Sequence, residues 1–388
     1  MHLLKPLALA GLIGSLAAPA VALEDGKITI WMGAGKGLER LQEVSRRFTE
    51  DLGIEVVIEE VEPLPDKFQQ AAATGDGPDI VLWAHDRFGE WAAGGLVSPI
   101  SPGTEFIDGI LPTAMEAVTF DGKIWAYPVS VEAAGLIYNT DLIDTPPTDF
   151  VQIATLDMPD GIAPIMWDYN NAYFTMALMM AGGGYAFQKV DGSYDGSETG
   201  VATDGAIAGA SVVQGLIESG LMPAGVDYGV MDGAMNKGEV AMVLNGPWAW
   251  GNLKTSGINF AVAPIPAVNG QPSPPFLGVY SAGLNAASPN KDLAVELLEQ
   301  YVLTDDGLAA WNAGSDLGAL ADMSAAAAQD DPNVAATLVN AAIAVPMPSN
   351  PEMGAFWSAM QPALTNITTG AQSPADALAD ARARILGE

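Results

Sequence analysis

The sequence predicts an α/β protein of two lobes, because strand-like and helix-like segments alternate along a long chain. Short apolar runs typical of buried strands are separated by segments whose apolar residues recur at helical spacing. Such alternation favours parallel sheets that are covered by helices on both faces. The chain has 388 residues, a length at which roughly two domains are expected. Periodicity alone does not say how the chain is divided between them.

The first elements follow one another closely. A strand is predicted over residues 27–31, and the turn Gly33-Ala34-Gly35-Lys36-Gly37 follows it. The next segment is a helix that ends at Gly53, because one apolar stripe runs through Leu38, Leu41, Val44 and Phe48. Further strands are predicted over residues 54–61 and 79–83.

The alternation resumes in the second half of the chain. Helices are predicted over residues 206–220 and 290–303, the second capped by Asn290, and a strand over 239–244. The segment Ser373-Pro374-Ala375-Asp376 combines an N-cap, a proline at the first helical position and an acidic first turn, so it opens the final helix. Two proline-rich segments, 264–275 and 345–351, are expected to be connectors.

The first 22 residues have the features of a signal peptide. One lysine precedes an apolar stretch that is too short for a membrane span, and Ala20-Val21-Ala22 offers a small-x-small cleavage site. The chain has no cysteine, which excludes disulfides, thiol catalysis and a lipid anchor on cysteine. A periplasmic location without an anchor is therefore expected.

The formal net charge is −32 at pH 7. Such a surface repels phosphate backbones and anionic lipid, so we expect no nucleic-acid partner and no membrane-surface binding. A small ligand is more easily neutral than anionic.

Motifs for nucleotide binding and for catalysis are incomplete. The glycine turn fails both the phosphate-loop pattern and the dinucleotide pattern, which leaves Lys36 as a solvated lysine or a hydroxyl-binding donor. After cleavage His85 is the single histidine, and its simplest role is a structural hydrogen bond. We therefore expect no cofactor, no metal site and no catalytic triad. Two carboxylates suffice for glycoside hydrolysis, so Asp86 and Glu132 keep that alternative open.

Tryptophan carries the positive signal, since several of the nine tryptophans stand in loops beside polar residues. Examples are Trp83-Ala84-His85-Asp86-Arg87, Trp167-Asp168-Tyr169 and Asn245-Gly246-Pro247-Trp248-Ala249-Trp250. Flat rings cover the apolar face of a pyranose, and charged side chains bind its hydroxyls. This composition is compatible with sugar binding, although scattered tryptophans are more often part of a core.

The segment from Gly77-Pro78-Asp79 to Arg87-Phe88 resembles the periplasmic maltose/maltodextrin-binding proteins. The likeness continues in order through Ala126-Tyr127-Pro128, Tyr173-Phe174, the Asn245–Trp250 segment, Ser281-Ala282-Gly283 and Ala355-Phe356-Trp357. It covers essentially the whole chain after residue 22. The resemblance implies the periplasmic binding protein fold, in which two α/β lobes close on a sugar around a hinge that the chain crosses three times. One lobe would comprise residues 23–131 and 280–322, and the other 132–279 and 323–388.

The same resemblance implies a function and a site. A monomeric, non-catalytic receptor would deliver an oligosaccharide to the membrane permease of an ATP-binding-cassette importer. The polar residues that match family positions for sugar hydroxyls are Lys36, Asp86, Arg87 and Glu132. The matching residues that line the cleft are Trp83, Ala84, Tyr173, Trp248, Met347 and Trp357.

Five positions depart from the family pattern by losing a polar or aromatic partner: Gly33, Gly35, Asn171, Ser358 and Gln361. We therefore expect an α-glucosyl disaccharide or a short maltodextrin to bind with an altered preference for chain length. Receptors for trehalose, sucrose or another neutral disaccharide stay as alternatives, together with the two-carboxylate hydrolase.

Overall fold

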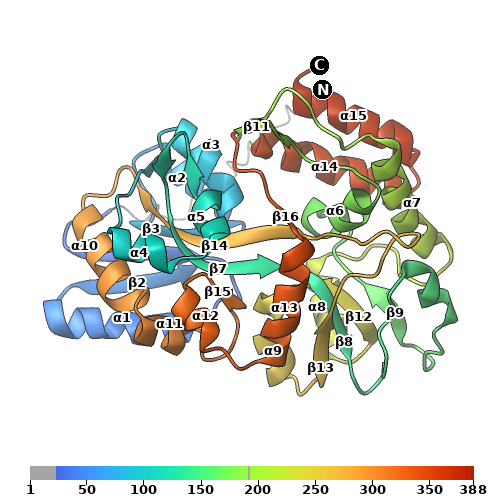
Figure 1. The fold of residues 1–388 in the computed structure, drawn as a ribbon, viewed down its shortest axis with the longest axis horizontal. Coiled ribbons are helices and arrows are strands. Elements are labelled where there is room, and N and C mark those ends of the chain that lie inside the picture. Colours follow the sequence, from blue (N-terminus) through green and yellow to red (C-terminus); the bar gives the residue numbers. More distant parts are fainter. Residues whose placement is uncertain (1–22, 191–192) are drawn as a thin grey trace, which may run out of the picture.

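The computed structural model describes residues 23–190 and 193–388, so the predicted signal peptide, residues 1–22, lies outside the described residues. Two α/β lobes lie side by side in Figure 1, and long strands run from one to the other. Among the described residues, none of the helices has the length and apolarity that a membrane crossing requires.

The first lobe is built on an eight-stranded mixed sheet. Six strands follow the order β15-β7-β14-β3-β1-β2, and both β4 and β16 pair with β14. Strand β1 is parallel to β2 and β3, whereas β14 is antiparallel to β3 and β7. The bounds are β1 Lys27–Met32, β2 Glu55–Glu60, β3 Ile80–Ala84, β4 Val97–Ser98, β7 Tyr127–Ala133, β14 Phe276–Asn285, β15 Ala319–Leu320 and β16 Val345–Pro346.

The second lobe has a four-stranded sheet in the order β13-β8-β12-β9. Its strands are β8 Gly135–Asn139, β9 Ala163–Met166, β12 Val240–Asn245 and β13 Phe260–Ala263. Two small hairpins stand apart from both sheets, β5 Thr119–Phe120 with β6 Lys123–Ile124, and β10 Gln188–Val190 with β11 Ser193–Asp195.

Helices cover the sheets and form the outside of both lobes (Figure 1). Those of the first part of the chain are α1 Leu38–Leu52, α2 Leu64–Ala72, α3 Phe88–Ala93, α4 Thr104–Gly109 and α5 Pro112–Ala117. The middle part contains α6 Ala172–Ala181, α7 Asp204–Glu218, α8 Tyr228–Asn236 and α9 Trp250–Thr255. The last part contains α10 Lys291–Leu297, α11 Asp305–Trp311, α12 Met323–Ala327, α13 Pro332–Ile343, α14 Met353–Thr368 and α15 Pro374–Leu386.

The chain passes between the two sheets where β7 leads into β8, and again where β13 leads to β14. A third passage runs through α12, α13 and β16 to α14 and α15, which pack against α6 and α7. The lobe boundaries predicted at 131/132 and 279/280 fall within β7 and β14, whose residues are all buried. The division into lobes at those residues stays a prediction.

The predicted elements lie close to the observed ones. The stripe that begins at Leu38 forms α1, which ends at Gly53 in the left-handed conformation (φ 72°). The Ser373 side chain caps α15 by accepting a hydrogen bond from the backbone N–H of Asp376. Asn290 is the N-cap residue of α10, as predicted, but its side chain makes no capping hydrogen bond. Its Oδ1 accepts the backbone N–H of Gly26 at 2.8 Å instead, and its amide nitrogen donates to Glu24 O, Lys27 O and the Asp79 carboxylate.

Asp79 is the centre of this buried network and provides a test of the fold. Its carboxylate accepts bonds from Thr29 N at 2.8 Å, Ser288 Oγ at 2.6 Å and Asn290 Nδ2 at 3.0 Å. We expect Asp79→Ala to lower the free energy of unfolding by about 3 kcal/mol, because buried donors to a charged group lose their acceptor. Urea denaturation measures this. The control is Asp108, which is exposed on α4, since Asp108→Ala should change stability by less than about 0.5 kcal/mol.

Candidate ligand-binding cleft

The glycine turn after β1 carries Lys36 into the space between the lobes. Gly35 and Gly37 adopt positive φ (75° and 71°), a conformation that glycine allows without steric cost. The Lys36 side chain forms an ion pair with Glu132 on β7, and both residues are buried. A charge pair removed from water in this way is expensive to keep unless each partner is satisfied.

Aromatic rings enclose the lysine. The Lys36 Nζ atom lies 4.9 Å from the ring centroid of Trp248 and 4.7 Å from that of Tyr280. Burial lowers the pKa of Lys36, and the charge of Glu132 opposes this shift. Trp248 belongs to the segment after β12 in the second lobe, so Lys36 is held between the two lobes.

The turn after β3 supplies the second polar group. The Trp357 Nε1–H on α14 donates to Asp86 Oδ2 at 2.9 Å, which joins the two lobes on this side. Burial raises the pKa of Asp86 to about 6. Arg87 is half-buried and donates to Glu90 at 3.0 Å, so it lies beside the other residues without pairing with them.

His85 has the structural role that its isolation in the sequence predicts. Its Nδ1 accepts the backbone N–H of Val279 at 3.0 Å, which leaves Nε2–H to donate to Met347 O at 2.8 Å. Burial lowers the pKa of His85 to about 4, so the ring is neutral at pH 7. His85 thereby ties β3, β14 and the segment of Met347 together beneath the cleft.

An aromatic wall faces these polar groups. The ring centroids of Tyr173 and Trp248 are 5.9 Å apart, and Tyr173 stands at the start of α6. Trp357 packs on Phe276 and Phe356, with ring centroids 5.9 and 4.9 Å apart respectively. Each of the three wall residues, Tyr173, Trp248 and Trp357, is half-buried, so part of its surface stays open to the cleft.

Trp83 lies over the glycine turn, since a Cβ at Gly33 would lie 2.9 Å from its indole ring. Ala84 packs beside Tyr173 and Trp357 in one apolar cluster with Met347. Lys36 therefore contacts Glu132 and Trp248, and Asp86 contacts Trp357. The other residues singled out in the sequence lie near these contacts: Trp83, Ala84, Arg87, Tyr173 and Met347. Their role in sugar binding stays a prediction.

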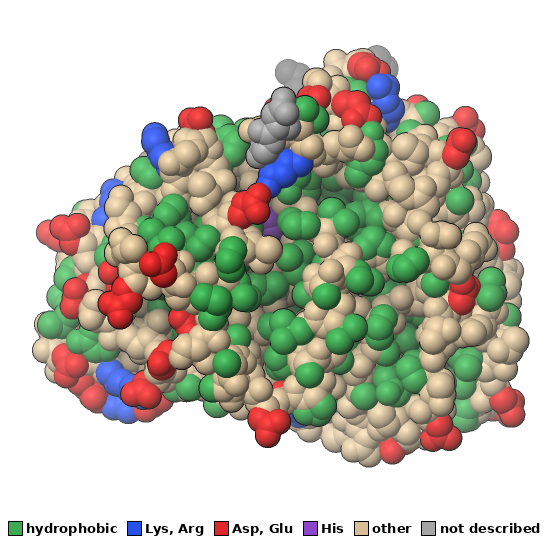
Figure 2. Space-filling view, in the orientation of Figure 1, with side chains coloured by type: hydrophobic (Ala, Val, Ile, Leu, Met, Phe, Trp, Pro, Cys, Tyr) green, Lys and Arg blue, Asp and Glu red, His purple; other side chains and the backbone are tan. Residues whose placement is uncertain are grey.

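A groove of about 550 Å³ adjoins this cleft between α2, α3 and the start of α14. Its lining is mainly polar and includes Gln69, Arg87, Glu90 and Ser358. In Figure 2 the lobes meet along a face rich in hydrophobic side chains, with the surface hollowed near the top of the view.

Sequence reasoning missed Tyr280, which supports Lys36 from below. Tyr280 is 2% exposed, and its hydroxyl has no hydrogen-bond partner among the residues that the structure describes. It lies within β14, a strand whose ten residues are all buried, so the sequence indicates core and nothing more. Only the pairing of β14 with β3 and β7 brings Tyr280 beneath the glycine turn.

Comparison with known proteins agrees with this architecture. Residues 34–309 match the family described as bacterial extracellular solute-binding proteins. The chain is 28% identical to the maltotriose-binding protein of Pyrococcus abyssi over 360 residues, which is 88% of this chain and 78% of that protein. It is 26% identical to the galactooligosaccharide-binding protein of Bacillus subtilis, over 81% of this chain and 77% of the relative. The maltodextrin-binding protein MdxE of Bacillus subtilis is 25% identical over 96% and 92% of the two chains.

The matched family residues span most of the chain, from the glycine turn through both sheets to α11. The match therefore covers the segments of Lys36, Glu132 and Trp248 together. The chain belongs to the family of bacterial extracellular solute-binding proteins.

Proposed function

We propose that this protein is the receptor of an ATP-binding-cassette sugar importer and captures maltose/maltodextrin-type α-glucosides in the cleft between its lobes. The observation that carries the proposal is the buried Lys36–Glu132 pair beside the rings of Tyr173 and Trp248. The relatives that bind maltotriose and maltodextrin support the same ligand class.

The chemistry of the cleft suits a neutral sugar. A pyranose presents an apolar face, on which the rings of Trp248 and Trp357 can stack, and a rim of hydroxyls. Each hydroxyl both donates and accepts, so it can bond to Lys36 as an acceptor and to Glu132 or Asp86 as a donor. Bonds to charged groups are roughly twice as strong as neutral ones. The ligand would bind both lobes at once and so favour their closure.

The five departures from the family pattern bear on chain length. Asn171 caps α6 by accepting the N–H of Tyr173, and the Ser358 hydroxyl bonds to Gly354 O. Each side chain already makes one bond within the protein, so Asn171 would meet a sugar hydroxyl mainly as a donor through Nδ2 and Ser358 mainly as an acceptor. We expect short maltodextrins to bind at least as tightly as long ones. A preference for trehalose, sucrose or a galactooligosaccharide is the alternative specificity.

We also propose that the protein does not hydrolyse its ligand. A two-carboxylate mechanism needs one acid free to give a proton and another free to attack or to activate water. Glu132 is paired with Lys36, and Asp86 accepts the indole N–H of Trp357. Both carboxylates are therefore already engaged by other side chains of the protein. Export through residues 1–22, a periplasmic location and a monomeric state stay predictions from the sequence.

Titration of residues 23–388 with maltose, maltotriose, trehalose, sucrose and glucose tests the proposal, with tryptophan fluorescence as the readout. Saturable binding of maltose or maltotriose at micromolar concentration or below, with the sugar recovered intact, is the expected result. A response to trehalose or sucrose alone would mean that the protein is a sugar receptor with a different specificity. Release of glucose from maltotriose would support the hydrolase instead. A lack of response to all five sugars would contradict the proposed ligand class.

The raised pKa of Asp86 gives a prediction for stability against pH. Because the folded protein binds this proton more tightly than an unfolded chain, whose carboxyl titrates near 3.9, the resulting stabilisation grows as pH falls through about 6. It is lost as pH rises above 6. We expect the melting temperature of wild type relative to Asp86→Asn to be higher at pH 5 than at pH 7. Asp168 also has a pKa of about 6, but it is present in both proteins. Its contribution therefore cancels in the difference between their melting temperatures. An equal difference at both pH values would contradict the assignment.

A further inference from the structure

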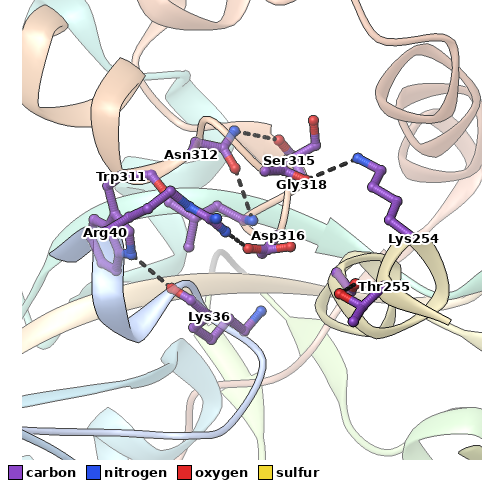
Figure 3. Close-up of polar contacts among 12 residues, drawn as sticks. Lys36, Arg40, Lys254, Thr255, Trp311, Asn312, Ser315, Asp316 and Gly318 are labelled. Carbon is purple, nitrogen blue, oxygen red and sulfur yellow. Dashed lines mark hydrogen bonds and ion pairs between the residues drawn. The ribbon is translucent and has the colours of Figure 1, made fainter.

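A loop of the first lobe, residues 312–318, lies against the segment of the second lobe that carries Trp248 (Figure 3). Lys254 Nζ donates to Gly314 O at 3.0 Å. A Cβ at Gly251 would lie 2.8 Å from Asp316 Oδ1, and a Cβ at Gly318 would lie 2.6 Å from the Pro247 ring. Positions 247, 251 and 254 follow a spacing of four and three, so they form one helical face. We call residues 312–318 the clasp loop.

The clasp loop is tied on its other side to the backbone of Lys36. The Arg40 guanidinium forms an ion pair with Asp316 and donates through Nε to Trp311 O at 3.0 Å. The Trp311 Nε1–H then donates to Lys36 O at 2.7 Å. Trp311 is fully buried, so its bond to Lys36 O is shielded from water. The loop therefore contacts both segments that hold the proposed ligand, the one with Lys36 and the one with Trp248.

The loop is stiff enough to link these two contacts. Ser315 adopts a left-handed conformation (φ 65°), which is uncommon for a residue with a side chain, and its hydroxyl donates to Asp331 at 2.8 Å. Leu317 N donates to the Asn312 side chain at 2.9 Å. Gln329 from outside the loop donates to Gly318 O at 2.8 Å. A loop bonded at both ends and in its middle moves as one body.

Asp316 is the point at which the second lobe meets the loop. The residue is 5% exposed, and Oδ2 is held by Arg40. Oδ1 is buried, has no hydrogen-bond partner in residues 23–190 and 193–388, and faces α9 at Gly251. Because the side chain is short and fixed by Arg40, it cannot swing aside for a larger residue. The absence of a side chain at position 251 is what lets α9 approach.

We propose that Asp316 and Arg40 are positioning residues for sugar binding. We also propose that Gly251 is the point at which α9 contacts Asp316, so that lobe closure acts on both residues through this contact. When the lobes close, α9 rests on the clasp loop, and the loop fixes Lys36 against Trp248 through Arg40 and Trp311. The inference rests on the proposed function and adds a contact outside the sugar cleft that sets affinity.

Gly251→Ala tests the contact between α9 and Asp316 without removing a ligand contact. We expect the Kd for maltotriose to rise at least tenfold, since the new methyl group would meet Asp316 before the lobes close. The melting temperature should not fall, because alanine favours a helix more than glycine. The matched control is Gly233→Ala in α8 of the same lobe, where a Cβ would meet nothing within 4 Å. It should leave Kd within twofold of wild type.

Lys254 provides a second variant on the same face. Lys254→Met should raise Kd about threefold, and exposed Lys237→Met on α8 is its charge-matched control. Combining Gly251→Ala with Asp316→Ala removes the obstructing oxygen, so the double variant should bind more tightly than Gly251→Ala alone. A merely structural role for Asp316 predicts additive losses instead. Wild-type affinity in Gly251→Ala would overturn the proposal.

A readout that needs no sugar separates this proposal from the proposed function. The chain has no cysteine, so spin labels on Glu105→Cys in α4 and Glu218→Cys in α7 report the distance between the lobes. Gly251→Ala should shift the distances toward longer values, and Gly233→Ala should not. If wild type binds none of the sugars, the proposed function fails, and these distances still decide the inference. Identical distances in both variants would overturn it.

Discussion

Trp248→Ala is expected to weaken maltotriose binding by at least a hundredfold. The indole is the proposed stacking face for the sugar. Its ring centroid lies 5.9 Å from that of Tyr173 and 4.9 Å from the Lys36 ammonium. Its removal deletes the stacking surface and loosens Tyr173 and Lys36 at the same time. Calorimetric titration of the variant measures the loss, and a thermal melt establishes that the variant is folded.

Two further tryptophan variants separate stacking from packing. Trp248→Phe keeps a flat ring and should bind with an affinity between wild type and Trp248→Ala. Trp125 lies in the first lobe, away from the cleft, and bonds through its indole N–H to Phe120 O. Trp125→Phe should therefore leave Kd unchanged. If Trp248→Ala binds maltotriose as tightly as wild type, the cleft assignment is wrong.

Lys36→Met is expected to abolish binding and to lower stability as well. The variant leaves the Glu132 carboxylate buried without its partner, which typically costs about 3–5 kcal/mol. The sugar also loses the single ammonium donor among the residues proposed to hold it. Urea denaturation and maltotriose titration measure the two effects separately.

A double variant divides the structural role of the pair from its binding role. In Lys36→Met with Glu132→Gln no unpaired charge remains, so the free energy of unfolding should return toward the wild-type value. Sugar binding should not return, because the hydroxyls have lost two of their proposed charged partners, Lys36 and Glu132. Recovery of binding together with stability would mean that the pair only maintains the fold.

The local elements were predictable because they depend on neighbours in the sequence. The stripe from Leu38 to Phe48 and the Ser373 cap each use contacts within a few residues, and both are confirmed. Asn290 takes the predicted N-cap position, but its side chain does not cap the helix because its partners, Gly26, Lys27 and Asp79, come from more than 200 residues away. Periodicity also does not show that β14 is one buried strand. Nor does it show that this strand contacts both parts of the chain.

The candidate site divides in a similar way. Lys36, Asp86 and Trp248 stand next to turns that follow strands, where open α/β sheets place ligands, so their side chains were identifiable from sequence. Tyr280 and the clasp loop were not, since nothing near them in the sequence differs from core or connector. Their positions depend on strand pairing and on contacts between lobes, which a single sequence does not encode in any local pattern.

The proposed function requires that one sugar is held by both lobes at once. Hydrogen–deuterium exchange of residues 23–388, with and without maltotriose, tests it most directly by locating the protected segments. We expect protection in residues 33–40 and 83–90 of the first lobe and, together with it, in 245–254 and 354–360 of the second. Protection confined to one lobe, or to segments outside the cleft, would contradict the account.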